Sequence, residues 1–195
     1  MVKFIGIDIG SQKIMMVRDD GEIVLTDTGS VSRPNLISFF GRTRLIGEEA
    51  LPQINGDNTV SMINRLLGES IKEYSSTEVS KHLKCKAIEH SSGLVALEVM
   101  YDGSIRQFDT TTLFSMMLSK LFDRIREVEG DDIKLAFSTS PTAPHSVIRA
   151  IKESCKIVGA DLNDVSIFDS SDCLVKTYGR KLQALRDNER GSIQV

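Results

Sequence analysis

The sequence predicts an α/β fold in which a smaller α+β unit is inserted into a larger unit. Three observations predict it. The chain opens on short strand-like runs separated by turns, its second half alternates strands with helices, and the stretch between them holds mainly short strands. Strand–helix–strand–helix order favours parallel pairing. We therefore expect residues 1–35 and 109–195 to form the larger unit and residues 36–108 to form the insertion.

The composition is typical of a soluble globular protein, because 41% of the 195 residues are hydrophobic and 26% are charged. The net charge of -3 provides no basic surface for nucleic acid, and no apolar run has the length of a membrane span. The first residues lead straight into a strand, without the pattern of a signal peptide. We expect a cytoplasmic protein with no nucleic-acid partner and no membrane partner.

The three cysteines support the same compartment. They are odd in number and widely spaced, which argues against a disulfide framework or a Cys-x-x-Cys metal site. Such usage is typical of a reducing compartment, where buried cysteine serves as small apolar filler. The cysteines are Cys85, Cys155 and Cys173.

The opening of the chain predicts a three-strand meander. Residues 4–9 and 14–17 are strand-like and flank a tight polar turn. Asp20 and Gly21 lie between two apolar runs and predict a hairpin that leads into a strand over residues 23–25. The polar turn therefore lies at the first corner of the meander.

The inserted stretch predicts short strands and one helical run. The run begins at Asn58, with Thr59 as its cap and Gly68 at its end. Its apolar residues share one helical face: Val60, Ile63 and Leu67. Residues 69–82 are polar and indicate no chemistry. A short helix or turn is expected over residues 47–53, and strands over residues 36–40, 43–46, 84–90, 94–100 and 104–108.

After Asp109 the pattern changes to long helices and single strands. Residues 110–112 are expected to cap a helix whose apolar residues recur at helical spacing as far as Val128. A strand over residues 133–139 follows. The next helix has Pro144 in its first turn and ends at Gly159.

The end of the chain predicts a strand over residues 165–168 and a last helix capped by Ser171. A charged loop is expected over residues 187–191, and residues 192–195 resemble the start of another strand. The last helix carries apolar side chains at helical spacing: Leu174, Val175, Tyr178, Leu182 and Leu185.

The polar turn at the first corner is the candidate binding site. Gly10 has no Cβ, so the backbone can turn there and approach a ligand closely. Successive N–H groups of Gly10, Ser11 and Gln12 form a nest that suits a phosphate, and Lys13 adds a positive charge. Asp8 lies at the end of the first strand and would repel a phosphate unless a cation bridges them. We therefore expect Asp8 to hold Mg²⁺ through water.

The residues of this turn also allow other interpretations to be compared with a phosphate site. An ordinary hairpin whose turn uses Gly10 and Ser11, with Asp8 as a strand-end acid, fits these residues equally well. A dinucleotide-binding loop needs G-x-G-x-x-G before a helix, whereas only Gly6 and Gly10 are present and a strand follows. The sequence contains no Walker A pattern either.

Several strings, in this order along the chain, resemble the nucleotide-binding domain of the seventy-kilodalton heat-shock chaperones. That family belongs to the actin-like ATPases, which are built on ribonuclease H-like folds. The resemblance covers nearly the whole chain as the first of two lobes. It implies binding of ATP or ADP with Mg²⁺, other chaperones or co-chaperones as partners, and unfolded clients bound through regions beyond Val195. The strings are residues 6–11, 33–39, 44–50, 58–60, 65–68, 156–159 and 178–179.

The chain departs from the family pattern at two chemical positions. The position of the family's catalytic lysine holds Asn64, with Arg65 beside it as a possible stand-in. The family has a glutamate that helps to hold the metal's water shell. At the matching position this chain has Ser170, with Asp169 before it and Asp172 nearby. Losing one preorganised donor typically costs about 3 kcal/mol, or a factor of about 10²–10³ in rate. Hydrolysis is therefore expected to be weak or absent.

The chain keeps the phosphate loop but lacks the family's catalytic lysine and glutamate. In this it is similar to the one-hundred-ten-kilodalton branch of the family, and this resemblance implies a role in nucleotide exchange on other chaperones. The family's second phosphate loop and adenosine pocket come from a second lobe, so the isolated lobe is expected to bind ATP weakly or not at all. Two alternatives stay open. One is an interaction scaffold that binds no nucleotide, and the other is a relative of sugar or acetate kinases, for which no substrate acid or base is identifiable.

Overall fold

The computed structural model describes the backbone of residues 3–191 and the side chains of residues 3–183. Its main sheet has five strands in the order β11-β10-β1-β2-β3. β1 runs parallel to β10, which runs parallel to β11, and β2 runs antiparallel to β1. The strands are β1 (Lys3–Ile9), β2 (Lys13–Arg18), β3 (Arg33–Pro34), β10 (Ile133–Thr139) and β11 (Val165–Asp169).

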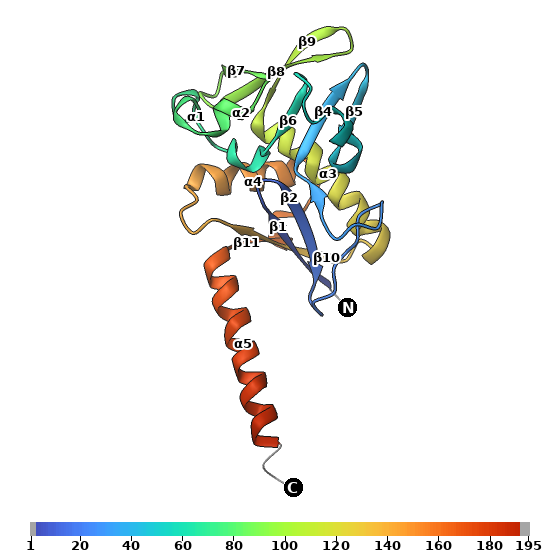
Figure 1. Cartoon of the computed structure of the whole chain (residues 1–195), viewed down its shortest axis with the longest axis vertical. Coiled ribbons are helices and arrows are strands. Elements are labelled where there is room, and N and C mark those ends of the chain that lie inside the picture. Colours follow the sequence, from blue (N-terminus) through green and yellow to red (C-terminus); the bar gives the residue numbers. More distant parts are fainter. Residues whose placement is uncertain (1–2, 192–195) are drawn as a thin grey trace.

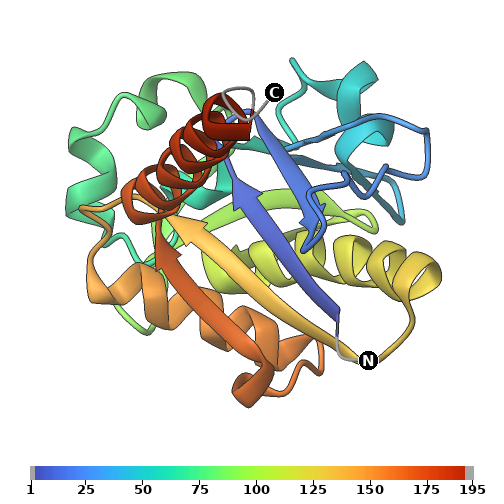
Figure 2. The same cartoon turned by 90° about the horizontal axis from the view of Figure 1, so that it is seen from below.

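Two helices cover one face of this sheet. α3 (Thr110–Glu129) and α4 (His145–Ile157) pack against each other, and Figure 2 shows them side by side behind the strands. α5 (Ser170–Gly191) leaves the sheet on the opposite side and projects from the body (Figure 1). None of the helices within the described residues is both long enough and apolar enough to cross a membrane.

Residues between β3 and α3 form two three-stranded sheets beyond α3 (Figure 1). One has the order β5-β4-β6 and the other the order β7-β8-β9, both antiparallel. Short helical turns connect them. The elements are β4 (Leu36–Phe40), β5 (Thr43–Ile46), η1 (Gly47–Gln53), β6 (Thr59–Ser61), η2 (Ile63–Arg65), α1 (Ile71–Ser76), α2 (Val79–His82), β7 (Lys86–Glu89), β8 (Val95–Tyr101) and β9 (Ser104–Asp109).

α3 lies at the centre of the core. Most of its apolar side chains are buried, and Leu113, Phe114 and Leu118 completely so, because the main sheet lies on one side and the small sheets on the other. Phe39 of β4 stacks on Phe108 of β9 with ring centroids 5.2 Å apart, which ties the two small sheets together. Burying this much apolar surface is the main stabilising term of the fold.

The fold class predicted from the sequence is confirmed, since the chain is mixed α/β with parallel strand–helix–strand pairing. The third strand of the meander was predicted wrongly. Ile23 makes only an isolated bridge to Val17. The chain then turns at Thr26, whose N–H donates to the Ser30 carbonyl, and β3 pairs with β2 instead.

The helical run predicted from Asn58 is also wrong. Residues Thr59–Ser61 form strand β6, in which Val60 is completely buried opposite Ile37 of the central strand β4. β-branched residues suit such a position. Met62 then takes a left-handed conformation (φ 54°) and the chain enters η2. The apolar residues at helical spacing are all buried, but by a strand and a turn rather than by one helix.

Smaller corrections concern helix ends. Asp109, not residues 110–112, caps α3, because its carboxylate accepts the Thr112 N–H at 2.9 Å. The polar stretch 69–82 contains α1 and α2, with Ser70 and Glu73 forming a capping box. Residues 187–191, expected as a loop, continue α5. The strand expected at residues 192–195 lies outside the described residues.

Candidate functional site

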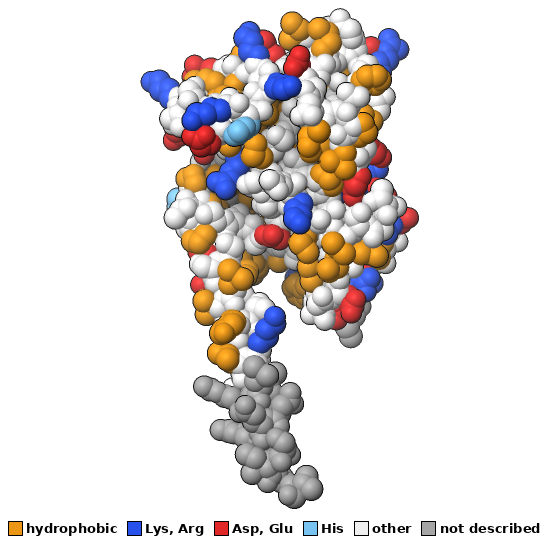
Figure 3. Space-filling model, in the orientation of Figure 1, with side chains coloured by type: hydrophobic (Ala, Val, Ile, Leu, Met, Phe, Trp, Pro, Cys, Tyr) orange, Lys and Arg blue, Asp and Glu red, His pale blue; other side chains and the backbone are white. Residues whose placement is uncertain are grey.

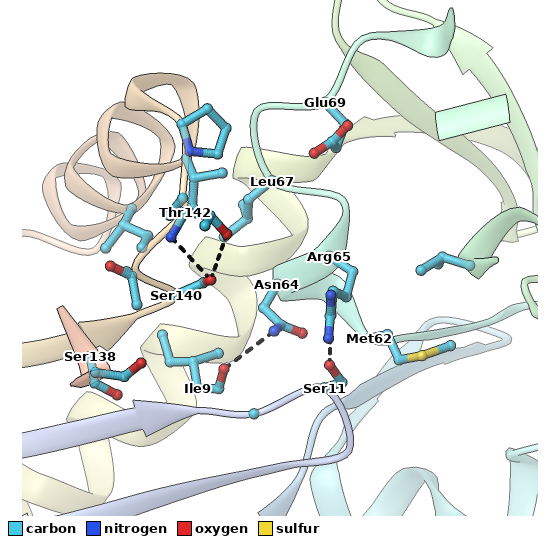
Figure 4. Close-up of a pocket in the computed structure, with 18 of the residues that line it drawn as sticks. Ile9, Ser11, Met62, Asn64, Arg65, Leu67, Glu69, Ser138, Ser140 and Thr142 are labelled. Atoms are coloured by element: carbon cyan, nitrogen blue, oxygen red, sulfur yellow. Dashed lines mark hydrogen bonds between the residues drawn. The ribbon is translucent and has the colours of Figure 1, made fainter. Parts of the chain in front are cut away.

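A pocket of about 870 Å³ opens at the carboxyl ends of the three parallel strands. Figure 4 shows the end of β1, the end of β10 and the η2 segment converging on it. Ligands of open α/β sheets bind at this edge because the strand ends and their loops converge there. The polar lining includes Asp8, Ser11, Asn64, Arg65, Ser138, Ser140 and Ser170, and the apolar lining includes Met62, Leu67, Val79, Val147 and Ile151.

Gly10 closes the turn between β1 and β2. Its N–H donates to the Lys13 carbonyl at 3.0 Å, so it is not free to bind a phosphate as the sequence suggested. A Cβ at Gly10 would lie 2.8 Å from the Lys13 carbonyl oxygen, which explains why the turn needs glycine. Within the described residues, the Ser11 and Gln12 N–H groups donate to no protein acceptor. Two adjacent donors therefore remain for an anion.

The side chains of the turn differ in where they lie. Ser11 faces the pocket, and its hydroxyl accepts a hydrogen bond from Arg65 Nε at 2.9 Å (Figure 4). Gln12 and Lys13 are exposed and lie outside the pocket lining. The Gln12 carbonyl accepts the Asn35 N–H at 2.8 Å, which fixes the outer side of the turn.

Two amide side chains brace the turn from inside the protein. Asn35 donates through Nδ2 to the Gly10 carbonyl (2.9 Å) and to Asn64 Oδ1 (3.0 Å). Asn64 donates in turn to the Ile9 carbonyl at 3.2 Å (Figure 4). Asn35 is only 1% exposed, and its Oδ1 has no partner in the described residues. Sequence reasoning missed Asn35, and the available signal was a lone amide between Pro34 and a fully apolar strand start.

Asp8 lies exposed at the end of β1 beside the end of β10. Its Oδ1 accepts a hydrogen bond from the Ser138 hydroxyl at 2.5 Å. No group of three or more potential metal-ligating side chains gathers anywhere in the described part of the chain. A magnesium ion at Asp8 would therefore keep much of its water shell and rely on ligand phosphates, as this hard cation commonly does.

At the end of β11, Ser170 is the residue that reaches the pocket. Asp169 Oδ1 instead accepts the side-chain hydroxyl (2.6 Å) and the backbone N–H (2.7 Å) of Ser171, so it caps α5. The hydrogen bonds from Ser171 hold the pKa of Asp169 below its usual value. Neither Asp169 nor Asp172 lines the pocket, so neither is positioned for the role that the family resemblance implies for a glutamate at the position of Ser170.

The charges around the pocket are unbalanced. Among the described lining residues, Arg65 is the only Lys or Arg, whereas three carboxylates face the pocket. Burial, together with the nearby Glu73 carboxylate, raises the pKa of Glu69. An anionic ligand would therefore need a cation, either Arg65 or a bound metal ion, to offset this field. The carboxylates are Asp8, Glu69 and Glu78, and His82 also lines the pocket.

Comparison of the sequence with family models and with curated proteins points to one protein family. The family model described as Hsp70 protein matches residues 4–179. Heat shock 70 kDa protein 2 of Paracoccidioides lutzii is 28% identical over 184 residues, which is 92% of this chain and 28% of that protein.

Two further relatives have different descriptions. A heat shock protein homolog of Lachancea kluyveri is 25% identical over 180 residues, 89% of this chain and 26% of its own length. A ribosome-associated molecular chaperone of Nakaseomyces delphensis is 29% identical over 180 residues, 90% of this chain and 29% of its own length. The chain therefore spans less than a third of the length of these relatives.

Proposed function

The chain belongs to the Hsp70 family, which has the actin-like ATPase fold, and from this premise we propose that it is the first lobe of an ATP-binding domain in a divergent chaperone. In this proposal, residues 1–35 and 109–195 are the ribonuclease H-like core and residues 36–108 an inserted subdomain. The lobe binds the phosphates of ATP or ADP with Mg²⁺. It does so more weakly alone than together with a second lobe.

The phosphate turn is the observation that supports nucleotide binding. Ser11 and Gln12 present two N–H groups without partners in the described residues, and the Asn35–Asn64 pair holds their backbone in place. Asp8 lies at the adjacent strand end, where its carboxylate would hold Mg²⁺ through water. Lys13 adds positive charge at the outer edge of the turn. When bound, the metal would neutralise phosphate charge.

Weak hydrolysis is the second part of the proposal. Asn64 carries no charge, and its amide is occupied by Ile9 and Asn35. Ser170 offers a hydroxyl where the family resemblance implies a carboxylate. Binding without efficient turnover suits a nucleotide-exchange-like co-chaperone in the cytoplasm, whose partners are other chaperones and unfolded clients.

The decisive experiment measures Mg-ATP and Mg-ADP affinity by calorimetry on the full-length gene product, followed by single-turnover hydrolysis. Asp8→Ala should weaken binding at least about tenfold, because it removes the carboxylate that holds the metal beside the phosphates. Asp131→Ala is the matched control, since Asp131 is 92% exposed in the loop before β10, at the opposite end of the sheet. A turnover rate equal to that of an ordinary family member would contradict the proposal.

A scaffold without nucleotide is the second candidate, favoured by one observation. The turn is already held by hydrogen bonds of its own, including the one from Gly10 N–H to the Lys13 carbonyl, and needs no ligand to be ordered. Absence of any measurable ATP or ADP affinity in the full-length gene product would select this candidate. A low-micromolar dissociation constant for the 195-residue chain alone would instead contradict the expected weakness of the single lobe.

A further inference from the structure

Arg65 is placed at the phosphate turn by the bend that follows β6. Met62 donates its N–H to the Asn35 carbonyl at 3.1 Å and takes a left-handed conformation, which redirects the chain toward the pocket. The Arg65 N–H donates to the Met62 carbonyl at 2.9 Å, so the residue is tied to that bend. The backbone of Arg65 is thus fixed by the same Asn35 that braces the turn.

The guanidinium of Arg65 uses only one of its hydrogen-bond donors within the described residues. Its Nε donates to Ser11 Oγ at 2.9 Å, and in the described residues no other hydrogen bond or ion pair involves this side chain. The Nη groups are therefore available to a ligand. By contrast, Arg33 is buried and paired with Asp27 and Glu48, as expected for a structural arginine.

Resting on the proposed function, we infer that Arg65 is the guanidinium that binds the ligand phosphate seated on the Ser11–Gln12 turn. A guanidinium forms a planar fork that matches two phosphate oxygens, and it keeps its charge at every physiological pH. Arg65 is the one Lys or Arg among the described lining residues, in a pocket that holds three carboxylates. The neighbouring Asn64 braces the turn and supplies no charge.

Ser11 has a double role in this arrangement. Its oxygen accepts the Arg65 Nε–H, which orients the guanidinium, and its own hydroxyl hydrogen and backbone N–H are left for the phosphate. Figure 4 shows Arg65 reaching from η2 to Ser11 at the tip of the hairpin. Phosphate contacts would therefore come from both sides: N–H groups from the turn and the guanidinium from η2.

The test compares Arg65→Gln, Arg65→Lys and Arg42→Gln in the full-length gene product, with Mg-ATP and Mg-ADP as probes in calorimetry. Arg42 is the matched control, because it is also exposed and held through Nε by one partner, Asp102, but on the turn between β4 and β5. Arg65→Gln should weaken Mg-ATP binding about ten- to a hundredfold, the value of a charge-assisted hydrogen bond. Arg65→Lys should keep part of the affinity, since it retains charge without the fork.

A second readout separates phosphate contact from a change in folding. Binding by the wild type should weaken as salt is raised, and Arg65→Gln should show a smaller salt dependence, because one charged contact is gone. The thermal midpoint without ligand should not change, since Arg65 is exposed.

Each outcome bears on a different claim. Equal affinities of wild type and Arg65→Gln would overturn the role of Arg65 and leave the proposed function standing. An equal loss in Arg42→Gln would overturn it too, because the effect would then be one of overall charge. If the wild type binds neither probe, the proposed function fails and the inference fails with it.

Discussion

α3 and α5 are the two longest helices among the described residues, with 20 and 22 residues, and their environments are opposite. Both carry apolar side chains at helical spacing. In α3 most of these side chains are completely buried, as at Phe114 and Leu118, and Val128 in the last turn is 38% exposed. In α5, Leu174 and Val175 are each 70% exposed, and Figure 3 shows hydrophobic side chains along the described part of that helix.

The difference shows what apolar spacing can and cannot predict. A 3.6-residue period predicts a helix and identifies its apolar face, but burial depends on what packs against that face. α3 lies between the main sheet and the small sheets, whereas α5 contacts β10 and β11 near its start. We therefore expect side chains on α3 to dominate the free energy of unfolding and those on α5 to matter little to it.

The largest expected effect is at the centre of α3. Phe114→Ala should lower the free energy of unfolding by about 3–5 kcal/mol, because it removes a fully buried ring and leaves a cavity. Urea unfolding followed by circular dichroism gives this value. A loss under about 1 kcal/mol would be outside the range for such a site and would mean that the core around α3 closes the cavity.

A smaller loss of unfolding free energy is expected at the turn between β1 and β2, which is held by side-chain hydrogen bonds rather than by apolar packing. Asn35→Ala should cost about 2 kcal/mol, because it leaves the Gly10 carbonyl and Asn64 Oδ1 without their donor. Asn163→Ala, at an exposed position of η3 (Leu162–Asp164), is the matched control and should change stability by less than about 0.5 kcal/mol. Equal effects of the two substitutions in urea unfolding would show that the network around the turn contributes nothing.

The end of α3 gives a pH-dependent contribution. The side chain of Glu129 is only 6% exposed and forms ion pairs with Lys3 at 3.0 Å and Arg18 at 2.7 Å. The hydrogen bond from Lys3 and the two positive charges outweigh burial and hold the pKa of Glu129 below its usual value. A carboxyl group with a lowered pKa stabilises the folded state above its unfolded-state pKa, and the stabilisation disappears as the pH falls through the folded-state pKa.

Glu129→Gln should therefore cost about 1 kcal/mol at pH 7, and the difference from wild type should vanish as the pH falls through the lowered folded-state pKa. Unfolding midpoints measured across this range test the sign. A difference that grows on acidification would contradict the pairing. Asp131→Ala, which alters a 92% exposed carboxylate near the same helix end, serves as the control.

The same distinction between local pattern and packing explains which predictions from the sequence succeeded. The strand over residues 133–139 and the long helix after Asp109 depend on local signals, and both were found. Asp8 and Ser11, predicted from the same local signals to bind a ligand, line the pocket, and their binding role stays a prediction. Gln12 and Lys13 were predicted as binding residues because they follow Ser11 in the sequence, but their side chains lie outside the pocket lining.

The rest of the site depends on contacts between segments far apart in sequence. Arg65 meets Ser11 across 54 residues, and Asn35 meets Gly10 across 25. The first contact follows from the bend at Met62 and from the pairing of β6 with β4, where the sequence pattern had predicted a helix, and the second follows from the pairing of β3 with β2. Single-sequence periodicity contains no information on such pairings, because the same apolar residues are buried in either case.

The smallest expected effect lies on α5 and tests the comparison most directly. Tyr178 is 67% exposed, so Tyr178→Ala should change the free energy of unfolding by no more than about 0.5 kcal/mol. Measured on the 195-residue chain by urea unfolding, this is several-fold less than the value for Phe114→Ala, although both substitutions remove an aromatic ring from a long helix. A loss comparable to that of Phe114→Ala would mean that the apolar face of α5 is covered in solution. Because burial on contact between copies depends on concentration, a dependence of the Tyr178→Ala effect on protein concentration would identify a second copy as the cover.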